Sequence, residues 1–378
     1  MMMLQFADPV KLKTKKIVFE DVYPAHDSGT LEQLKELSSK RRAIEESING
    51  SKSITDAIAR EMSGGLTSQT EQDLQKLEQY LPLLENLVYH VGLDSNSCIM
   101  RLTSDLKIRW SSALGSSSLF NLAGPKFFQI DNLQFEQSMT LFLYGAMLWK
   151  WASEILSINS VQSATLFRKA AGVYHYLALE VLPSLQALAP ERPPEATSSV
   201  SLVMSLICLA EAQAVTIRKA EEKGNSGGLL AKLHNGVVQL LDEAAVILYS
   251  ATKECKDISV QFVNFISSCK ALHQLRSHKY LAESLKVAGQ VGLAVGVVRR
   301  ALTNGQKQMP GEESWRLVFK QEINELAELL RKYEHENDFV WHEKIPVDDE
   351  LPQPEAKKIV SCIDYHPQKW ERSLLFST

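Results

Sequence analysis

The side chains that could carry acid–base, nucleophilic or metal chemistry are scattered along this chain and form no known catalytic spacing. No Gly-x-x-x-x-Gly-Lys-Ser/Thr loop is present to hold a nucleotide phosphate, and no Gly-x-Ser-x-Gly elbow of a serine hydrolase is expected. His273 and His278 are five residues apart, so they would face different sides of a helix instead of sharing a metal ion. The acidic run Asp348-Asp349-Glu350 lacks the further oxygen ligands of a calcium-binding loop. We therefore predict that the protein is not an enzyme and that it uses no cofactor or metal.

The composition is that of a chain that can build a large core but has little bulk attraction for polyanions. Of the 378 residues, 45% are hydrophobic, and the formal net charge is −4. Basic residues are not interleaved with aromatic residues on one face, so no nucleic-acid partner is expected. The five cysteines are never spaced as Cys-x-x-Cys, which is typical of reduced thiols in the cytoplasm. No window approaches about 18 uninterrupted apolar residues, so no membrane-spanning helix is expected.

Helical patterns dominate the chain after roughly the first 25 residues, which read as extended. Thr30-Leu31-Glu32-Gln33 fits a capping box and predicts a helix that begins there and ends near Asn49-Gly50. Pro82 should kink a later helix, and the alternation in Leu106–Trp110 predicts a strand or an extended arm. The other predicted helices cover residues 54–62, 67 onward, 132–156, 160–182, 197–222, 229–252, 258–303 with a break near Ser277 or His278, and 312–336.

Small residues recur where consecutive antiparallel helices would meet closely, for example Ala170-Ala171-Gly172 and Gly289, Gly292 and Gly296. This pattern is typical of repeat-like helical packing, although no strict repeat of about 34 residues is present. We predict an elongated domain dominated by α-helices, with a tetratricopeptide-like core and a small N-terminal extended or β element. The expected divisions are a basic lead (residues 1–15), one domain (16–346) and an extended tail (347–378).

The ten residues Asn337 to Pro346 follow the last predicted helix. Asn337 can adopt the left-handed conformation that ends a helix, and an aromatic and β-branched run then leads to the proline. The same ten residues resemble the closing signature of the Bro-type domain of the Alix, Brox and rhophilin family. That signature typically reads Asn-Asp-Phe-Ile-Tyr, two variable residues, a basic residue and Val-Pro.

Further blocks resemble the same family in the same order. Ser201 to Gln213 is similar to its Leu-Ser-Leu-Ile-Met-Leu-Ala-Gln-Ala-Gln helix, and Leu229 to Leu233 is similar to Ile-Ile-Ala-Lys-Leu. Residues 106–120, 136–156 and 354–360 also match, although Ala356 replaces a family glycine. The chain is identified as a member of this family and most resembles its short, stand-alone plant proteins.

The resemblance implies a curved, banana-shaped helical domain that binds partners and has no enzymatic activity. It implies binding of the C-terminal amphipathic helix of Snf-type ESCRT-III subunits by an apolar groove. The protein would be cytoplasmic and recruited to endosomes, where it would act in multivesicular-body sorting and vacuolar or lysosomal trafficking. By motif, the family's binding patch falls on Leu229 and Leu233, one helical turn apart, and on Thr216 with its neighbour Ile217 in the preceding helix.

The patch departs from the family pattern in two places. Members that bind well have a large aromatic residue at the position of Thr216, and Ile217 replaces it only if the helix rotates slightly. An acidic residue is expected around Ser157 to Ser160, where the chain has only Asn159 as a strongly polar candidate. Loss of one aromatic hot spot costs about 2–4 kcal/mol of binding free energy.

Other functions stay open at this stage. The protein could be a negative regulator that competes for an ESCRT component, or a general helical scaffold that does not bind ESCRT-III. Leucines four residues apart most often have an ordinary role in the core.

The last residues form no prenylation box, so any membrane association is expected to be peripheral and mediated by partners. Leu374, Leu375 and Phe376 could form a short docking peptide, be disordered, or pack back on the domain.

Overall fold

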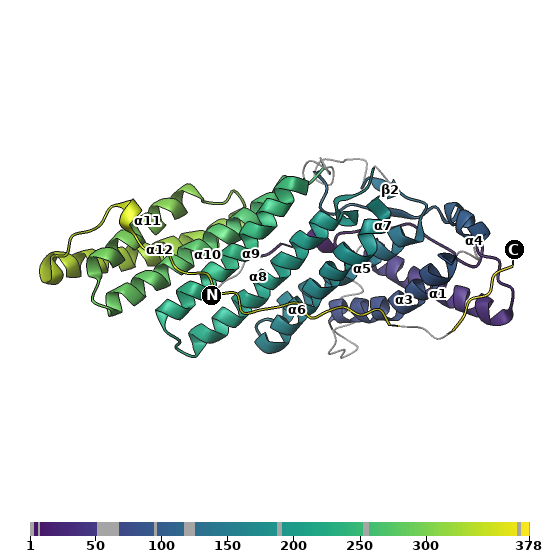
Figure 1. Ribbon diagram of the computed structural model, residues 1–378, viewed down its shortest axis with the longest axis horizontal. Coiled ribbons are helices and arrows are strands. Elements are labelled where there is room, and N and C mark those ends of the chain that lie inside the picture. Colours follow the sequence, from purple (N-terminus) through teal and green to yellow (C-terminus); the bar gives the residue numbers. More distant parts are fainter. Residues whose placement is uncertain are drawn as a thin grey trace.

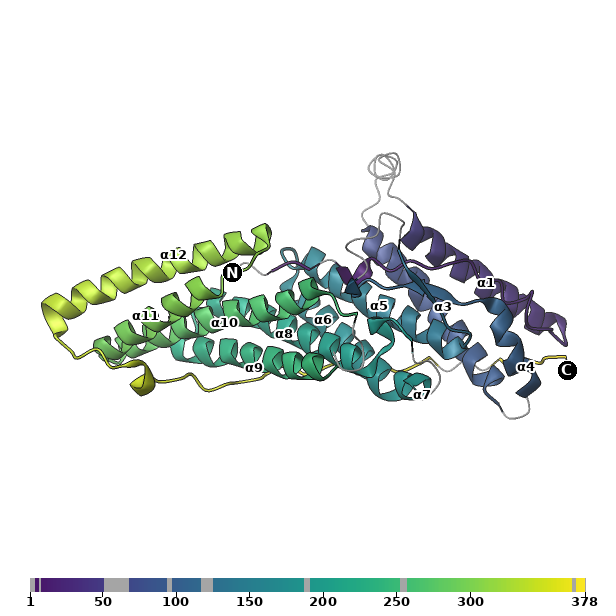
Figure 2. The same ribbon diagram turned by 90° about the horizontal axis from the view of Figure 1, so that it is seen from above.

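The computed structural model describes residues 4–6, 8–50, 68–93, 97–116, 125–186, 191–251, 257–368 and 372–377. Within these ranges the chain is an elongated stack of helices (Figure 1 and Figure 2). The helices are α1 (Ser28–Asn49), α3 (Gln69–Val91), α4 (Ser97–Leu102), α5 (Leu133–Ile155), α6 (Ser160–Tyr176), α7 (Leu182–Gln186), α8 (Ser198–Glu222), α9 (Gly227–Ala251), α10 (Val260–Val287), α11 (Val291–Lys307) and α12 (Glu313–Glu336). The predicted helix at 54–62 lies outside the described residues.

The long helices pack in chain order from α5 onward. Helix α5 packs on α6, α6 on α8, α8 on α9, α9 on α10, α10 on α11 and α11 on α12. One apolar core runs through the described part of the stack, from the N-terminal Leu4 to Leu374 near the C-terminus. The predicted helical, repeat-like fold class is therefore confirmed, because each long helix buries its apolar face mainly against its neighbours in sequence.

Helix α8 is unusually apolar along its length. Among the described residues it alone is long and apolar enough to cross a membrane, with a mean hydropathy of 1.9 over its most apolar window. However, 72% of that window is buried inside the stack. The side chains of α8 thus supply the core between α6 and α9.

The predicted capping box at the start of the first helix was wrong. Helix α1 begins before Thr30, because the Asp27 carboxylate caps it and accepts a 2.7 Å hydrogen bond from the Thr30 amide. The Thr30 hydroxyl instead accepts a 3.0 Å hydrogen bond from the amide of Leu375, which lies near the other end of the sequence. The Thr30 hydroxyl, which the local sequence pattern assigned to a helix cap, therefore makes a long-range contact with the C-terminal tail.

Two further local predictions were also wrong. Helix α10 continues through Ser277 and His278, and the break comes at Gly289, whose φ of 78° needs the conformational freedom of glycine. Asn337 keeps a right-handed conformation with φ −66°, and the left-handed residue is His342, with φ 51°. Residues Asn337–Trp341 extend α12 by a π-helical turn instead of an extended run.

A small antiparallel sheet lies beside the N-terminal segment. Strand β1 (Arg109–Ser111) pairs with β2 (Phe127–Gln129), and Thr14 forms an isolated bridge to Trp110. The strand predicted over Leu106–Trp110 is shorter than expected, because a 3-10 turn ends at Leu106 and Lys107 is left-handed. The N-terminal segment thus bridges to the sheet and contacts α5. It corresponds to the small N-terminal extended element that was predicted.

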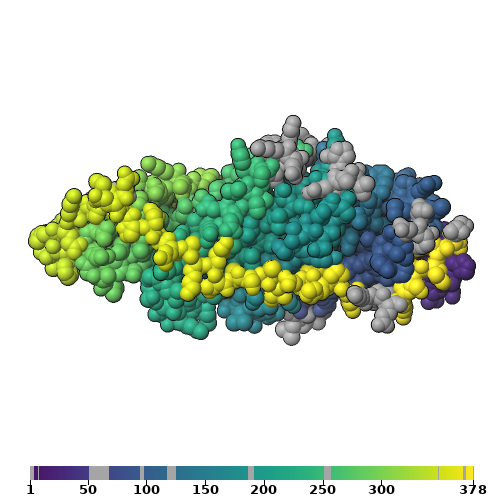
Figure 3. All heavy atoms as spheres, viewed as in Figure 1, coloured from purple at the N-terminus to yellow at the C-terminus, as the bar shows by residue number. Residues whose placement is uncertain are grey.

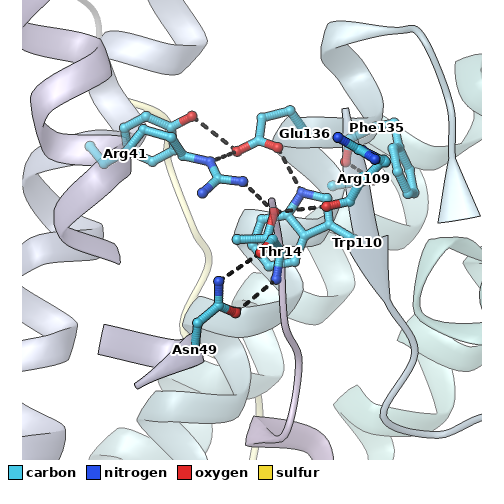
Figure 4. A network of polar contacts seen from close by, with 9 residues as sticks. Thr14, Arg41, Asn49, Arg109, Trp110, Phe135 and Glu136 are labelled. Carbon is cyan, nitrogen blue, oxygen red and sulfur yellow. Dashed lines mark hydrogen bonds and ion pairs between the residues drawn. The ribbon is translucent and has the colours of Figure 1, made fainter. Parts of the chain in front are cut away.

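The N-terminal segment, the sheet and three helices meet at one buried carboxylate, Glu136 of α5 (Figure 4). It accepts hydrogen bonds from Arg41 Nε of α1 (2.5 Å), Trp110 Nε1 of β1 (2.6 Å) and Tyr80 OH of α3 (3.1 Å). The Arg41 side chain also donates to the hydroxyl of Thr14 and lies 5.0 Å from the Trp110 ring centre. Burial, and then the Glu136 charge, raise the pKa of Tyr80, which keeps its hydroxyl protonated as a donor.

We predict that Arg41→Met lowers the free energy of unfolding by about 3–5 kcal/mol, because it leaves the Glu136 carboxylate buried without its cation. Arg42→Met is the matched control, since the neighbouring Arg42 pairs with Glu46 at the surface, where both side chains are more than half exposed. That variant should change the free energy by about 0.5 kcal/mol or less. Urea unfolding of the two variants measures the difference, and equal losses would contradict the role given to the buried pair.

Candidate partner-binding surface

The four residues predicted to bind a partner lie on the hairpin of α8 and α9. The structure gives them unequal access to solvent. Ile217 is 0% exposed and Leu233 is 3% exposed, so both belong to the core. Thr216 and Leu229 are half-buried and reach the surface. Of the predicted patch, therefore, Leu229 and Thr216 can contact a partner directly, while Ile217 and Leu233 support them from below.

The hydroxyl group of Thr216 is already hydrogen-bonded within its own helix. Its hydroxyl donates a 2.9 Å hydrogen bond to the Ala212 carbonyl oxygen within α8. The side chain therefore needs no partner for its hydroxyl and offers its methyl group instead. The acidic position sought near this patch is filled by Asn159, whose side chain caps α6 by accepting from the Gln162 amide at 3.0 Å.

Gln213, one turn before Thr216, holds α8, α9 and the C-terminal tail together. Its amide nitrogen donates to the carbonyl oxygens of Leu233 (2.7 Å) and Lys357 (3.0 Å), and its amide oxygen accepts from the Ile359 amide (3.0 Å). The side chain is 0% exposed. Sequence reasoning placed Gln213 in a family helix but did not find this role, because the tail residues that it bonds are more than 140 positions away.

The tail crosses the stack from α11 to α1 along one face (Figure 3). It contacts α11 at Gly296 through Leu351, α9 at Gly236 through Lys357, and α6 at Gly172 through Ile363. Near its end Leu374 is 5% exposed, and the Ser377 amide donates to the Pro24 carbonyl oxygen at 2.9 Å. Of the three possibilities for Leu374 to Phe376, the structure shows packing against the domain.

Tyr365 fixes the middle of the tail in a pocket of tyrosines. Its ring centre lies 5.1 Å from that of Tyr176 and 6.3 Å from that of Tyr144. Its hydroxyl donates a 3.0 Å hydrogen bond to Glu85 of α3. Burial raises the pKa of Glu85 to about 7, although the hydrogen bond from Tyr365 opposes this shift.

Two histidines that sequence reasoning did not pair meet inside the stack. His234 of α9 and His273 of α10 approach with their Nδ1 atoms 3.0 Å apart, so one ring must donate and the other accept. Burial lowers the pKa of both rings, which keeps them neutral. No group of three or more candidate ligands that could hold a metal ion occurs in the described ranges. The pair is an internal polar contact between neighbouring helices.

The expectation that the chain has no Gly-x-Ser-x-Gly pattern was wrong, because the turn between α8 and α9 contains one, although without the context of a catalytic elbow. Residues Gly224 to Gly228 read Gly-Asn-Ser-Gly-Gly, which satisfies Gly-x-Ser-x-Gly. A nucleophile elbow lies between a strand and a helix, whereas this turn joins two helices. Ser226 serves the start of α9, where its carbonyl oxygen accepts from the amides of Leu229 (3.0 Å) and Leu230 (3.1 Å). The motif therefore shapes the hairpin that carries Leu229.

A family model described as the BRO1-like domain matches residues 34–377. The match covers most of the chain and includes the tail. The chain belongs to the BRO1-like domain family. The resemblance identified from the sequence is thereby confirmed.

Curated relatives of this Bro1-like domain are distant in sequence. BRO1 domain-containing protein BROX of Homo sapiens is 22% identical over 321 residues, which are 81% of this chain and 76% of the relative. Programmed cell death 6-interacting protein of Xenopus laevis is 25% identical over 249 residues, which are 64% of this chain. The matched region spans only 27% of that longer protein.

Solved structures share the fold of the Bro1-like domain. ALIX in complex with the SIVmac239 PYKEVTEDL late domain superposes with a TM-score of 0.72 at 19% identity, covering 94% of this chain and 48% of that chain. The complex of ALIX BRO1 and CHMP4C gives a TM-score of 0.71 at 18% identity and covers 96% of both chains. The elongated, curved helical fold expected from the resemblance is therefore confirmed.

We predict that Gly236→Ala destabilises the protein, although such a change within a helix usually stabilises it by about 1 kcal/mol. A methyl group at Gly236 would overlap the Lys357 carbonyl oxygen and push the tail away from α9. Gly228→Ala is the control in the same helix, because its added methyl would meet only the Ser284 side chain, with the hydroxyl oxygen 3.1 Å away. Thermal unfolding and tryptic cleavage at Lys357 and Lys358 measure the effect. Slower cleavage or a higher Tm in Gly236→Ala would contradict the close contact.

We also predict that stability falls as pH rises through the window between the ordinary Glu85 pKa of 4.5 and its folded value of about 7. In this window the folded protein binds more protons than the unfolded chain, so each pH unit removes at most about 1.4 kcal/mol. Glu85→Gln should remove this contribution and still accept the Tyr365 hydrogen bond. Urea unfolding from about pH 5 to pH 8 compares the two proteins, and identical slopes would exclude Glu85 as the titrating group.

Proposed function

We propose that this Bro1-like domain binds the C-terminal amphipathic helix of a Snf-type ESCRT-III subunit and acts as an endosomal adaptor in multivesicular-body sorting. The observation that carries the proposal is that Leu229 of α9, which the sequence resemblance assigns to the family's binding patch, is only half-buried, as is Thr216. The ALIX BRO1 domain, whose fold covers 96% of this chain, forms a complex with CHMP4C. Membrane association would be peripheral and would follow from the partner.

The surface favours weak binding of an apolar helix face. Leu229 and the Thr216 methyl group are small anchors, and no aromatic side chain stands at the Thr216 position. Two strongly exposed apolar residues, Ile158 (85%) and Val161 (71%), lie at the corner between α5 and α6. This corner is on the same edge of the molecule as the α8–α9 turn (Figure 1). Anchors spaced along a bound helix could therefore contact both corners.

We predict saturable binding of a CHMP4C C-terminal helix peptide that Leu229→Asp weakens at least tenfold, or by about 1.4 kcal/mol. The charge would have to be desolvated beneath the peptide, whereas in the free protein it remains partly in water. Leu329→Asp is the control, because Leu329 is also a half-buried leucine but lies on α12. Calorimetric titration measures the affinities, and circular dichroism verifies that each variant is folded. Leu233 is unsuitable as a test, since its 3% exposure makes an unfolded variant the expected result.

Thr216→Phe supplies the opposite change. It should tighten binding of the same peptide, because an aromatic anchor adds apolar contact area at the partly exposed end of α8. Equal affinity of the wild type, Leu229→Asp and Thr216→Phe would move the partner site away from this patch. Absence of any binding would favour the scaffold function instead.

A further inference from the structure

The tail between Lys357 and Ile363 is bonded to the stack through every second residue. The Lys357 amide donates to the Lys232 carbonyl oxygen at 2.9 Å, and the Lys357 carbonyl accepts from Gln213. Ile359 donates to Gln213 at 3.0 Å. The Ser361 carbonyl oxygen accepts from Arg168 Nε at 2.7 Å, and the Ile363 amide donates to the Arg168 carbonyl oxygen at 3.0 Å. The odd-numbered residues of this segment therefore direct their backbone groups toward one edge.

The residues between them direct their backbone groups the other way. In an extended chain the N–H and C=O groups of successive residues point to opposite edges. Lys358, Val360 and Cys362 make no backbone hydrogen bond to any described residue, although side chains at two of these positions have polar contacts. Their donors and acceptors recur about every 7 Å along the chain. This extended segment thus presents a row of unpaired backbone groups, as the edge of a β-strand does, and the bonds of its other edge hold it in place.

An apolar groove of ≈ 790 Å³ lies along the tail at this point. Its floor is formed by side chains from the first half of α8 and the second half of α9, and His175 of α6 and Ser361 and Cys362 of the tail complete the lining. The apolar lining residues are Leu202, Leu206, Leu209, Val246 and Ile247. The bonding partners of the odd-numbered residues, Lys232, Gln213 and Arg168, are not among the lining residues. Of the unpaired residues, Cys362 lines the groove itself, and the Lys358 side chain reaches the lining residue Glu243.

The charged residues beside the groove are already paired. Asp242 lies 2.5 Å from Lys270, and Glu243 lies 2.7 Å from Lys358 of the tail. These pairs leave no net charge for a ligand to neutralise at the rim. A ligand for this groove must instead satisfy a row of backbone groups and cover aliphatic side chains.

We propose that the tail edge and the apolar groove together bind an extended peptide segment of a partner protein, with aliphatic residues at alternate positions. The segment adds as a β-strand, so that its backbone pairs with Lys358, Val360 and Cys362 while every second side chain lies on the groove floor. A helix would leave the tail edge unpaired, because its own backbone groups are bonded internally. This site is separate from the Leu229 patch, which lies at the opposite ends of α8 and α9, and the proposal does not depend on ESCRT-III binding.

The test uses amide hydrogen exchange of the full chain, measured by NMR, with a defined probe. The probe is an acetylated and amidated heptapeptide, Lys-Val-Thr-Val-Thr-Val-Lys, whose valines face one side when it is extended. The same peptide N-methylated at its three central residues is the control, because these residues have no N–H group to donate and their methyl groups obstruct strand pairing. In the free protein the amides of Ile359 and Ile363 should exchange slowly, whereas those of Val360 and Cys362 should exchange quickly.

The probe should bind with a Kd of about 1 mM or tighter and slow exchange at Lys358, Val360 and Cys362 at least tenfold. The methylated peptide should do neither. Val246→Asp should weaken binding at least tenfold by placing a charge on the groove floor. Val260→Asp should not, and it is a matched control because Val246 is 70% exposed and Val260, outside the groove, is 67% exposed. Both positions are exposed enough for the variants to fold.

Three results would overturn the proposal. The first is no binding of the probe at concentrations above about 1 mM. The second is binding that shifts groove resonances without slowing exchange at the three tail amides, which would assign the groove to apolar ligands or helices. The third is protection of these amides that rises with protein concentration in the absence of peptide, which would assign the edge to pairing between two copies of the chain.

Discussion

The buried carboxylate of Glu136 is the constraint on which the N-terminal half of the molecule depends. A carboxylate removed from water must be surrounded by donors, and here the donors come from α1, α3 and β1. The positions of these three elements relative to α5 are therefore fixed by a single group. The Thr14 bridge to β1 and its contact with Arg41 bring the first residues of the chain into the same arrangement. Packing of apolar faces alone would allow these elements to slide, because it has no direction.

The tail provides a second constraint, which acts along the length of the stack. In a linear array of helices each element is stabilised mainly by its neighbours, so the two ends can open independently. Here one extended segment contacts α11, α9 and α6 through glycines and is bonded to α8 through Gln213. It then reaches α3 through Tyr365 and the start of α1 through Leu375. Distant helices thus share one connecting element, and local opening of one pair disturbs the contacts of the next.

Features that follow from hydrophobic periodicity or from a continuous motif, such as helix bounds and family membership, were predicted well from the sequence. The bounds of α5, α8, α9 and α12 follow from apolar spacing, and they agree with the structure to within a few residues. The break at Gly289 was missed, because this glycine was assigned with Gly292 and Gly296 to close helix packing instead of to a turn. The Thr30 cap was misassigned because the hydroxyl is used by Leu375. The site was predicted only in part, because periodicity places Leu229 and Leu233 on one face but does not show that Leu233 faces the core.

The arrangement of the tail has a mechanical consequence. A load that pulls the two ends of the stack apart acts along the tail, so the bonds at Lys357, Ile359, Ser361 and Ile363 would be strained together, in shear. A load that lifts the tail from its C-terminal end would break the contacts of Leu375, Tyr365 and Ile363 one after another, as in peeling. The same contacts are therefore strong against stretching of the domain and weak against removal of the tail from one end. The response of the domain to force depends on the direction of pulling.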